Sequence, residues 1–185
     1  INWTDKGDKF KNLILDKIID LKDDGTFKLN MNYFDYATEL KMTNENFSQL
    51  FGKAPRNPIK EQLTQFHMDI AASIQSATEE IVLRLAKSIS KESDSKNLCM
   101  AGGVALNCVA NGKIFKEKIF ENIWIQPAAG DAGGALGAAL GLWHKELKNA
   151  RLLPIEDKMK GSYLGPEFSN LEIENILKKI GANYN

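Results

Sequence analysis

The sequence has no long apolar run and no excess of either sign of charge. Its longest apolar stretch, residues 132–143, is too short to span a bilayer, and the first ten residues do not resemble a signal peptide. Lysine and arginine number 24 and so do aspartate and glutamate, so no basic surface for nucleic acid is indicated. We therefore expect a soluble, cytoplasmic protein that binds neither nucleic acid nor membrane.

Cysteine and histidine are scarce, with two of each. Cys99 and Cys108 fit no zinc or redox spacing, and we interpret both as reduced thiols of the core. His67 is interpreted as a surface or boundary residue, because His67 and Asp69 would not face the same way on a helix. His144 lies near a predicted helix C-terminus, where it is either a favourable end charge or simply exposed. No H-x-x-x-H or H-E-x-x-H motif occurs, so no self-sufficient metal site is predicted.

What the sequence does contain is enough apolar material for a domain core, at 43% hydrophobic residues. Apolar spacing predicts a helix over residues 10–21. After the turn at Gly25, alternation over residues 26–38 predicts one strand or a hairpin. Asn57 and Pro58 suit a cap and a first turn. From Ile59 onward, apolar residues at steps of three or four predict a long amphipathic helix that ends near Ser90.

The rest of the chain alternates short apolar runs with glycine turns and helices, which is typical of an α/β layer. Neither short run alternates in polarity, so we expect neighbouring central strands covered on both faces. The long helix is expected to pack across them. The predicted elements are a strand at 97–101, a helix at 106–118, a strand at 122–127, a helix at 132–147, a linker at 151–165 and a helix at 170–180 capped by Ser169.

A glycine pair, Gly102-Gly103, separates the first of these strands from its helix. Glycines at such a turn leave backbone N–H groups free and remove side chains that would block a ligand, which suits a phosphate or a nucleotide. The segment is neither a G-x-G-x-x-G motif nor a P-loop. On the pattern alone, a tight turn without a ligand is an equal alternative.

A second glycine motif follows the second strand. Gly130 and Asp131 open a helix on which Gly133, Gly137 and Gly141 form one bare stripe, and such a stripe allows close approach to a sheet or a ligand. Asp131 is either a helix N-cap, which the spacing alone favours, or a carboxylate that ligates a metal holding phosphates.

Three segments resemble consecutive signatures of the nodulation-protein type O-carbamoyltransferases: LTQFHMDIAASIQSATEE, LCMAGGVALNCVANGKI and IWIQPAAGDAGGALGAAL. The resemblance extends from about Phe27 to the last residue. It implies an α/β fold similar to the second lobe of the actin, sugar-kinase and heat-shock-ATPase (ribonuclease H-like) domain. Residues 1–150 would form this lobe, and residues 151–185 would be a linker and the start of the following domain.

The resemblance also implies an activity. Members of this family make carbamoyl-adenylate from carbamoyl phosphate and ATP, and they move the carbamoyl group to a hydroxyl of a sugar or natural product. Asp131 would be one ligand of a divalent metal such as iron or magnesium. The residues implied to bind the nucleotide are Gly102, Gly103, Val104, Asn107 and Gly130.

The family's metal site also uses a pair of histidines from a first lobe, and its adenylate-forming domain follows the transferase domain. We therefore expect this chain to be a piece of a longer protein and to be inactive in transfer by itself. Two alternatives stay open. One is a sugar or acetate kinase with an actin-like fold, and the other is a nucleotide-binding module without chemistry.

Overall fold

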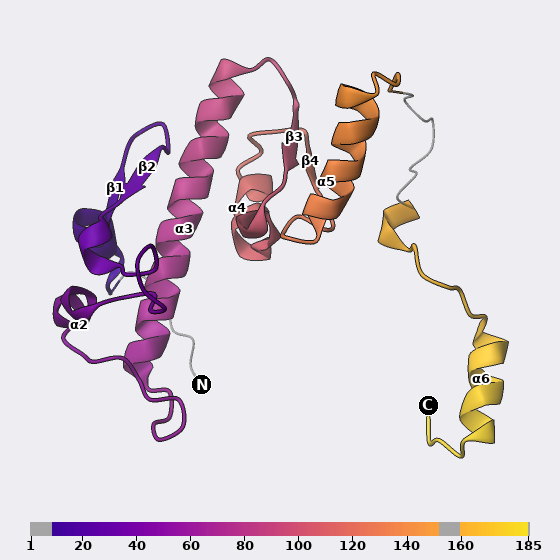
Figure 1. Ribbon diagram of the computed structural model, residues 1–185, viewed down its shortest axis with the longest axis horizontal. Coiled ribbons are helices and arrows are strands. Elements are labelled where there is room, and N and C mark those ends of the chain that lie inside the picture. Colours follow the sequence, from indigo (N-terminus) through magenta and orange to yellow (C-terminus); the bar gives the residue numbers. More distant parts are fainter. Residues whose placement is uncertain (1–8, 152–159, 185) are drawn as a thin grey trace. The chain divides into compact units, whose positions relative to one another are not determined.

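The computed structural model describes residues 9–151 and 160–184. The described residues form two compact units, which divide between Gly133 and Gly134. The first unit is built on one long helix, α3 (Gln65–Glu92), with an N-terminal layer on one side and two strands and a helix on the other (Figure 1). The predicted mixed α/β class is confirmed.

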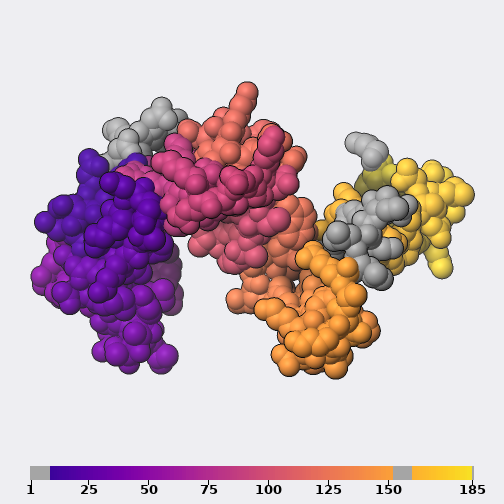
Figure 2. All heavy atoms as spheres, turned by 90° about the horizontal axis from the view of Figure 1, so that it is seen from above, coloured from indigo at the N-terminus to yellow at the C-terminus, as the bar shows by residue number. Residues whose placement is uncertain are grey.

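The N-terminal layer packs against α3 through a small apolar core. Ile14, Ile18 and Phe51 are buried there together with Ala77 of α3, and the layer and α3 share a continuous surface (Figure 2). The elements of the layer are α1 (Lys11–Leu13), the π turn η1 (Ile14–Ile18), β1 (Ile19–Leu21), β2 (Phe27–Leu29), the 3-10 turn η2 (Met31–Tyr33) and α2 (Glu45–Phe51).

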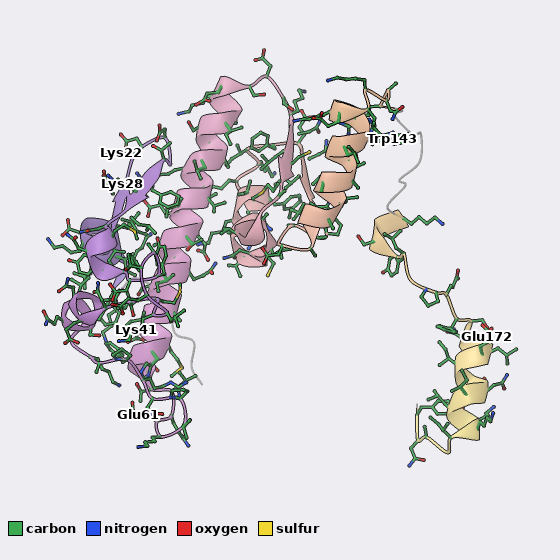
Figure 3. All side chains as sticks on the ribbon, in the orientation of Figure 1. Lys22, Lys28, Lys41, Glu61, Trp143 and Glu172 are labelled. Atoms are coloured by element: carbon green, nitrogen blue, oxygen red, sulfur yellow. The ribbon has the colours of Figure 1, made fainter. Side chains whose placement is uncertain are left out.

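The hairpin of β1 and β2 corrects two predictions. The helix predicted as far as residue 21 ends at Ile18, because β1 pairs antiparallel with β2 and the Asn30 N–H donates to the Ile18 carbonyl at 2.8 Å. Of the strands predicted over residues 26–38, β2 forms, and η2 follows it. Lys22 and Lys28 are carried by this hairpin (Figure 3).

The turn of the hairpin lies directly on α3. Gly25 adopts a φ of +86°, and a Cβ added there would lie 2.4 Å from the backbone nitrogen of Leu85. Only glycine allows both this conformation and this close approach.

α3 begins at Gln65 rather than at Ile59. Asn57 does cap a turn, since its Oδ1 accepts from the Ile59 N–H at 3.0 Å, but that turn does not continue as helix. The helix starts after Thr64, whose N–H donates to Nδ1 of His67 at 3.0 Å. His67 is thus half-buried at the helix start, in keeping with its interpretation as a boundary residue.

α3 is buried on two faces, and not only along the predicted apolar stripe. Ile74 and Ile89 of that stripe are 46% and 45% exposed. Asp69, Ser73 and Glu79 are instead 4%, 0% and 6% exposed. The N-terminal layer covers one face and the helix α4 (Cys108–Lys116) with its cap covers the other, and both contact polar residues of α3.

Two parallel strands and a helix cover the second face of α3. Ala86 of α3 is buried against Leu98 and Ile123 of the strands, so the predicted packing of the long helix across neighbouring strands is confirmed. The elements are β3 (Asn97–Met100), the 3-10 turn η3 (Gly103–Leu106), α4 (Cys108–Lys116) and β4 (Asn122–Ile125).

Within the described part of the first unit, no element covers the other face of the β3–β4 sheet, which we call the open face. Both strands alternate between exposed and half-buried residues, so the first unit by itself does not provide the predicted cover on both faces. Cys99 and its partner Trp124 in the register lie among the exposed residues. Cys108, at the start of α4, is also exposed. Neither thiol is therefore a core residue. Cys99 lies on the face of the sheet that α3 and α4 leave uncovered, and Cys108 is exposed on α4 itself.

The second unit contains the helices predicted near the end of the chain. Its α6 is capped as predicted, since Ser169 Oγ accepts from the Glu172 N–H at 3.3 Å (Figure 3). His144 is half-buried, and its Nδ1 lies 3.0 Å from the Asn149 carbonyl oxygen. The elements are α5 (Gly133–Gly141), which starts at the last residue of the first unit, the π turn η4 (Leu142–Glu146), the 3-10 turn η5 (Lys160–Ser162) and α6 (Asn170–Lys179).

Two sequence predictions concern the limits of these units. Most of the predicted linker, residues 152–159, lies outside the described residues, and the domain boundary at residue 150 stays a prediction. Within the described ranges, no helix is both long and apolar enough to cross a membrane.

Candidate functional site

The two glycine motifs meet at the carboxyl edge of the β3–β4 sheet. Because the strands are parallel, Met100 and Ile125 end at the same edge. The N–H of Gly102 donates to the Ala129 carbonyl at 2.8 Å, which joins the loop after β3 to the loop after β4. Ligands of open α/β sheets bind at the carboxyl ends of strands, so the structure brings the predicted nucleotide residues to a suitable place.

The two glycines of the first motif differ in what they require. Gly102 has φ +100° and ψ 159°, a conformation that is essentially restricted to glycine. Gly103 has no such restriction, and a Cβ added to it would meet no heavy atom within 4 Å. Val104 is 59% exposed. The first glycine therefore shapes the turn, and the second lies beside open space.

Asn107 ends the loop and caps α4. Its Oδ1 accepts from the Ala110 N–H at 3.1 Å and from Gln75 Nε2 at 3.0 Å. Its Nδ2 donates to Gln75 Oε1 at 2.9 Å. The oxygen of this side chain is thus used within the protein, and one N–H of Nδ2 is left for a ligand.

The second motif leaves its carboxylate without a partner. Asp131 is exposed, and it has no hydrogen bond or ion pair with any described residue. α5 begins at Gly133, and the Gly133 N–H is bonded to the Gly130 carbonyl at 3.0 Å. A Cβ at Gly133 would lie 2.2 Å from the carbonyl oxygen of Ala128 in the preceding loop, whereas a Cβ at Gly137 or Gly141 would meet no heavy atom within 4 Å. The approach of the glycine stripe to a sheet or a ligand therefore stays a prediction.

The described residues do not form a complete metal site. Over residues 9–151 and 160–184, no three His, Cys, Asp or Glu side chains group so that they could hold a metal ion. Asp131 can supply one carboxylate ligand, so any further ligands must come from elsewhere. Its role as a metal ligand stays a prediction.

The sequence interpretation missed a polar cluster behind the loop. Gln75 Nε2 donates to Glu79 Oε1 at 2.9 Å, and Lys113 of α4 forms an ion pair with Glu79. Burial alone raises the pKa of Glu79, but the hydrogen bonds from Lys113 and Gln75 outweigh it and lower the pKa. The sequence feature that could have indicated this cluster is the spacing of Gln75 and Glu79, which lie four residues apart on a predicted helix.

The sequence is similar to one family model and to several known proteins. Residues 4–140 match the family model described as carbamoyltransferase N-terminus. An uncharacterized protein of Synechocystis sp. is 61% identical over 170 residues, which make up 92% of this chain and 28% of that protein.

Two nodulation proteins are also similar. NolO of Bradyrhizobium diazoefficiens is 45% identical over 107 residues, 58% of this chain and 19% of that protein. NolNO of Sinorhizobium fredii is 41% identical over 121 residues, 65% of this chain and 17% of that protein. The chain therefore spans less than a third of the length of these three curated relatives.

Proposed function

Because this chain belongs to the carbamoyltransferase family, we propose that it is part of a longer O-carbamoyltransferase. The donor is carbamoyl-adenylate, made from carbamoyl phosphate and ATP, and the acceptor is a hydroxyl of a sugar or natural product. The acceptor oxygen attacks the carbamoyl carbon, and the bond from that carbon to the adenylate phosphate oxygen breaks. AMP leaves with the electron pair of that bond, and the hydroxyl proton passes to a base that we do not assign to this segment.

The convergence of the two loops at the carboxyl edge of the sheet carries this proposal. Open space beside Gly103 leaves room for a phosphate or a ribose against the backbone. Val104 offers exposed apolar surface to the adenine. Asn107 keeps one N–H of Nδ2 free for a hydrogen bond to the ligand. Gly130 follows Ala129, whose carbonyl accepts from the Gly102 N–H, so it lies next to the first glycine motif.

In the same proposal, Asp131 is one ligand of a divalent cation such as iron or magnesium. Its carboxylate is exposed and has no partner among the described residues, and carboxylate oxygen is a preferred ligand for hard cations. When bound, the cation would neutralise phosphate charge. The role of Asp131 is to hold the cation beside the Gly102–Asn107 loop.

We propose that the rest of the protein covers the open face of the β3–β4 sheet. In this arrangement the first unit belongs to the second lobe of an actin-like domain, and its partners are the first lobe and the adenylate-forming domain of the same protein. Trp124, on this face of β4, is 50% exposed in this chain, and burying so large an apolar side chain under the rest of the protein would be stabilising. The chain by itself would catalyse no transfer.

Gly103→Val in the full-length protein tests the nucleotide site. Residue 103 has room for a side chain, so the fold should survive and the new side chain should exclude the ligand. We expect calorimetry to show ATP binding weakened by at least about tenfold, which corresponds to about 1.4 kcal/mol. Gly112→Val is the matched control, because Gly112 in α4 also has no neighbour within 4 Å. ATP affinity that is unchanged in a folded Gly103→Val protein would make the glycine pair a plain turn.

A further inference from the structure

A chain of hydrogen bonds connects α4 to the glycine loop through α3. Lys113 is paired with Glu79, Glu79 accepts from Gln75 at 2.9 Å, and Gln75 exchanges two hydrogen bonds with Asn107 at 3.0 and 2.9 Å. Glu79 is only 6% exposed. This cluster lies between two helices, and its far end is the residue that closes the loop.

The carboxylate of Glu79 determines which group donates and which accepts in each of these hydrogen bonds. An ionised Glu79 can only accept, so the NH₂ group of Gln75 must face it. Gln75 Oε1 is thereby presented to the NH₂ group of Asn107. The oxygen of Asn107 is left to accept from Gln75 Nε2 and from the Ala110 N–H, which is the cap of α4. Reversal of the Asn107 amide would lose all three bonds.

Asn107, whose side chain these hydrogen bonds orient, also takes part in the hydrogen bonds of the Gly102–Asn107 loop. The N–H of Asn107 donates to the Val104 carbonyl at 2.9 Å, and the N–H of Ala105 donates to the Gly102 carbonyl at 3.0 Å. Asn111 Nδ2 adds a bond to the Ala105 carbonyl at 2.7 Å. The segment from Gly102 to Asn107 is therefore held at its C-terminal end by side-chain amides.

We propose that Gln75 is a positioning residue that fixes the Asn107 amide, and with it the Gly102–Asn107 loop, for nucleotide binding. The effect of Gln75 on the loop does not depend on any ligand. Its effect on nucleotide binding rests on the proposed function, because it requires that the loop contacts the nucleotide.

The same helix carries a matched control. Gln65 Nε2 donates to Asp69 Oδ1 at 2.7 Å, and Lys9 is paired with Asp69 at 3.0 Å. Asp69 is 4% exposed. Gln65 and Asp69 thus also pair an amide with a buried carboxylate four residues later, but Gln65 is exposed at the start of α3, and its hydrogen bond lies beside the N-terminal layer rather than beside the loop.

The experiment compares Gln75→Glu with Gln65→Glu. Each variant keeps the shape of the side chain and places a second carboxylate four residues before a buried one. Gln75→Glu should lower the melting temperature, and Gln65→Glu should do so less, because a carboxylate in the first turn of a helix is favourable. Only Gln75→Glu should speed hydrogen exchange of the Gly102, Ala105 and Asn107 amides, by about tenfold for one or two lost hydrogen bonds. Only this variant should weaken ATP binding by a similar factor.

A swapped variant, Gln75→Glu with Glu79→Gln, separates positioning from mere stability. It restores a donor–acceptor pair between residues 75 and 79 and the net charge of the wild type, so the melting temperature should recover in part, although Lys113 loses its ion pair with Glu79. Glu at position 75 still cannot donate to Asn107 Oδ1. Exchange in the loop should therefore stay fast, and ATP binding should stay weak.

The results in the full-length protein decide whether Gln75 positions the loop. Fast loop exchange in both Gln75 variants, with normal exchange in Gln65→Glu, supports the positioning role. Normal loop exchange in the swapped variant, or equally fast exchange in Gln65→Glu, overturns it. Absence of ATP binding to the wild type would refute the proposed function, and the exchange data would still test whether Gln75 positions the loop.

Discussion

The N–H of Gly102 and the carbonyl of Ala129 are hydrogen-bonded at 2.8 Å across the carboxyl edge of the two-stranded sheet. This bond brings together the two glycine motifs that the sequence places on separate strands. It also fixes the backbone of Gly102 in a conformation, φ +100° and ψ 159°, that side chains do not tolerate. The edge should therefore respond differently to substitutions at two neighbouring glycines.

Gly102→Ala should destabilise the chain, whereas Gly103→Ala should not. The strained backbone at position 102 predicts a loss of about 1–3 kcal/mol in the free energy of unfolding. At position 103 an added Cβ meets nothing within 4 Å, so we expect a change within about 0.5 kcal/mol. Urea denaturation of the two variants makes the comparison, and equal losses would contradict the assigned roles.

Acid should weaken the packing of α3 against α4. Hydrogen bonds from Lys113 and Gln75, opposed by burial, keep the pKa of Glu79 below its ordinary value of 4.5. A carboxyl whose pKa is lowered by folding contributes stability that is complete above its unfolded pKa and is lost as the pH falls through its folded pKa. The free energy of unfolding should thus decrease below about pH 4.5, with a smaller slope in Glu79→Gln. Identical slopes would show that Glu79 is not responsible.

The open face of the sheet predicts a difference in thiol reactivity. Cys99 is exposed in this chain beside Trp124, and in our proposal the rest of the protein covers this face. With Cys108→Ser as background, a thiol reagent should modify Cys99 rapidly in the 185-residue chain and at least about tenfold more slowly in the full-length protein. Equal rates in the two proteins would show that the rest of the protein does not cover this face of the sheet.

The strands β3 and β4 were predictable because each is a short apolar run that is followed by a glycine turn. The positions of β3 and β4, and their parallel pairing, follow from the repeated order of strand, glycine turn and helix. The start of α3 was not predictable, because Asn57 does satisfy an N–H group and only the later course of the chain shows that its turn stops. β1 was missed because pairing with β2 overrides local helical spacing in residues 19–21.

For the candidate site, local sequence identified the glycines but not their support. Gly102 and Gly130 stand out as turn residues in the sequence alone. The burial of Glu79 depends on α4, and the contact of Gln75 with Asn107 joins residues far apart in the chain. Such contacts arise from the packing of two helices, which no periodicity within one helix specifies.

Asp131→Asn distinguishes a metal ligand from a structural carboxylate. The Asp131 side chain has no partner among the described residues, so the melting temperature should change little. Loss of a charged ligand should lower bound metal and carbamoyl transfer in the full-length protein by about 100-fold or more. Asp94→Asn is the control, because Asp94 is exposed before β3, away from the carboxyl edge. Full activity and full metal content in Asp131→Asn would remove the residue from the site.

The most direct measurement is the formation of product by the full-length protein. Mass spectrometry of a mixture with carbamoyl phosphate, ATP and sugar acceptors should detect carbamoyl-adenylate and a carbamoylated hydroxyl. Both should require ATP and carbamoyl phosphate, the carbamoylated hydroxyl should diminish in Gly103→Val, and neither product should form with the 185-residue chain alone. A full-length protein that binds ATP and yet forms neither product would contradict the account.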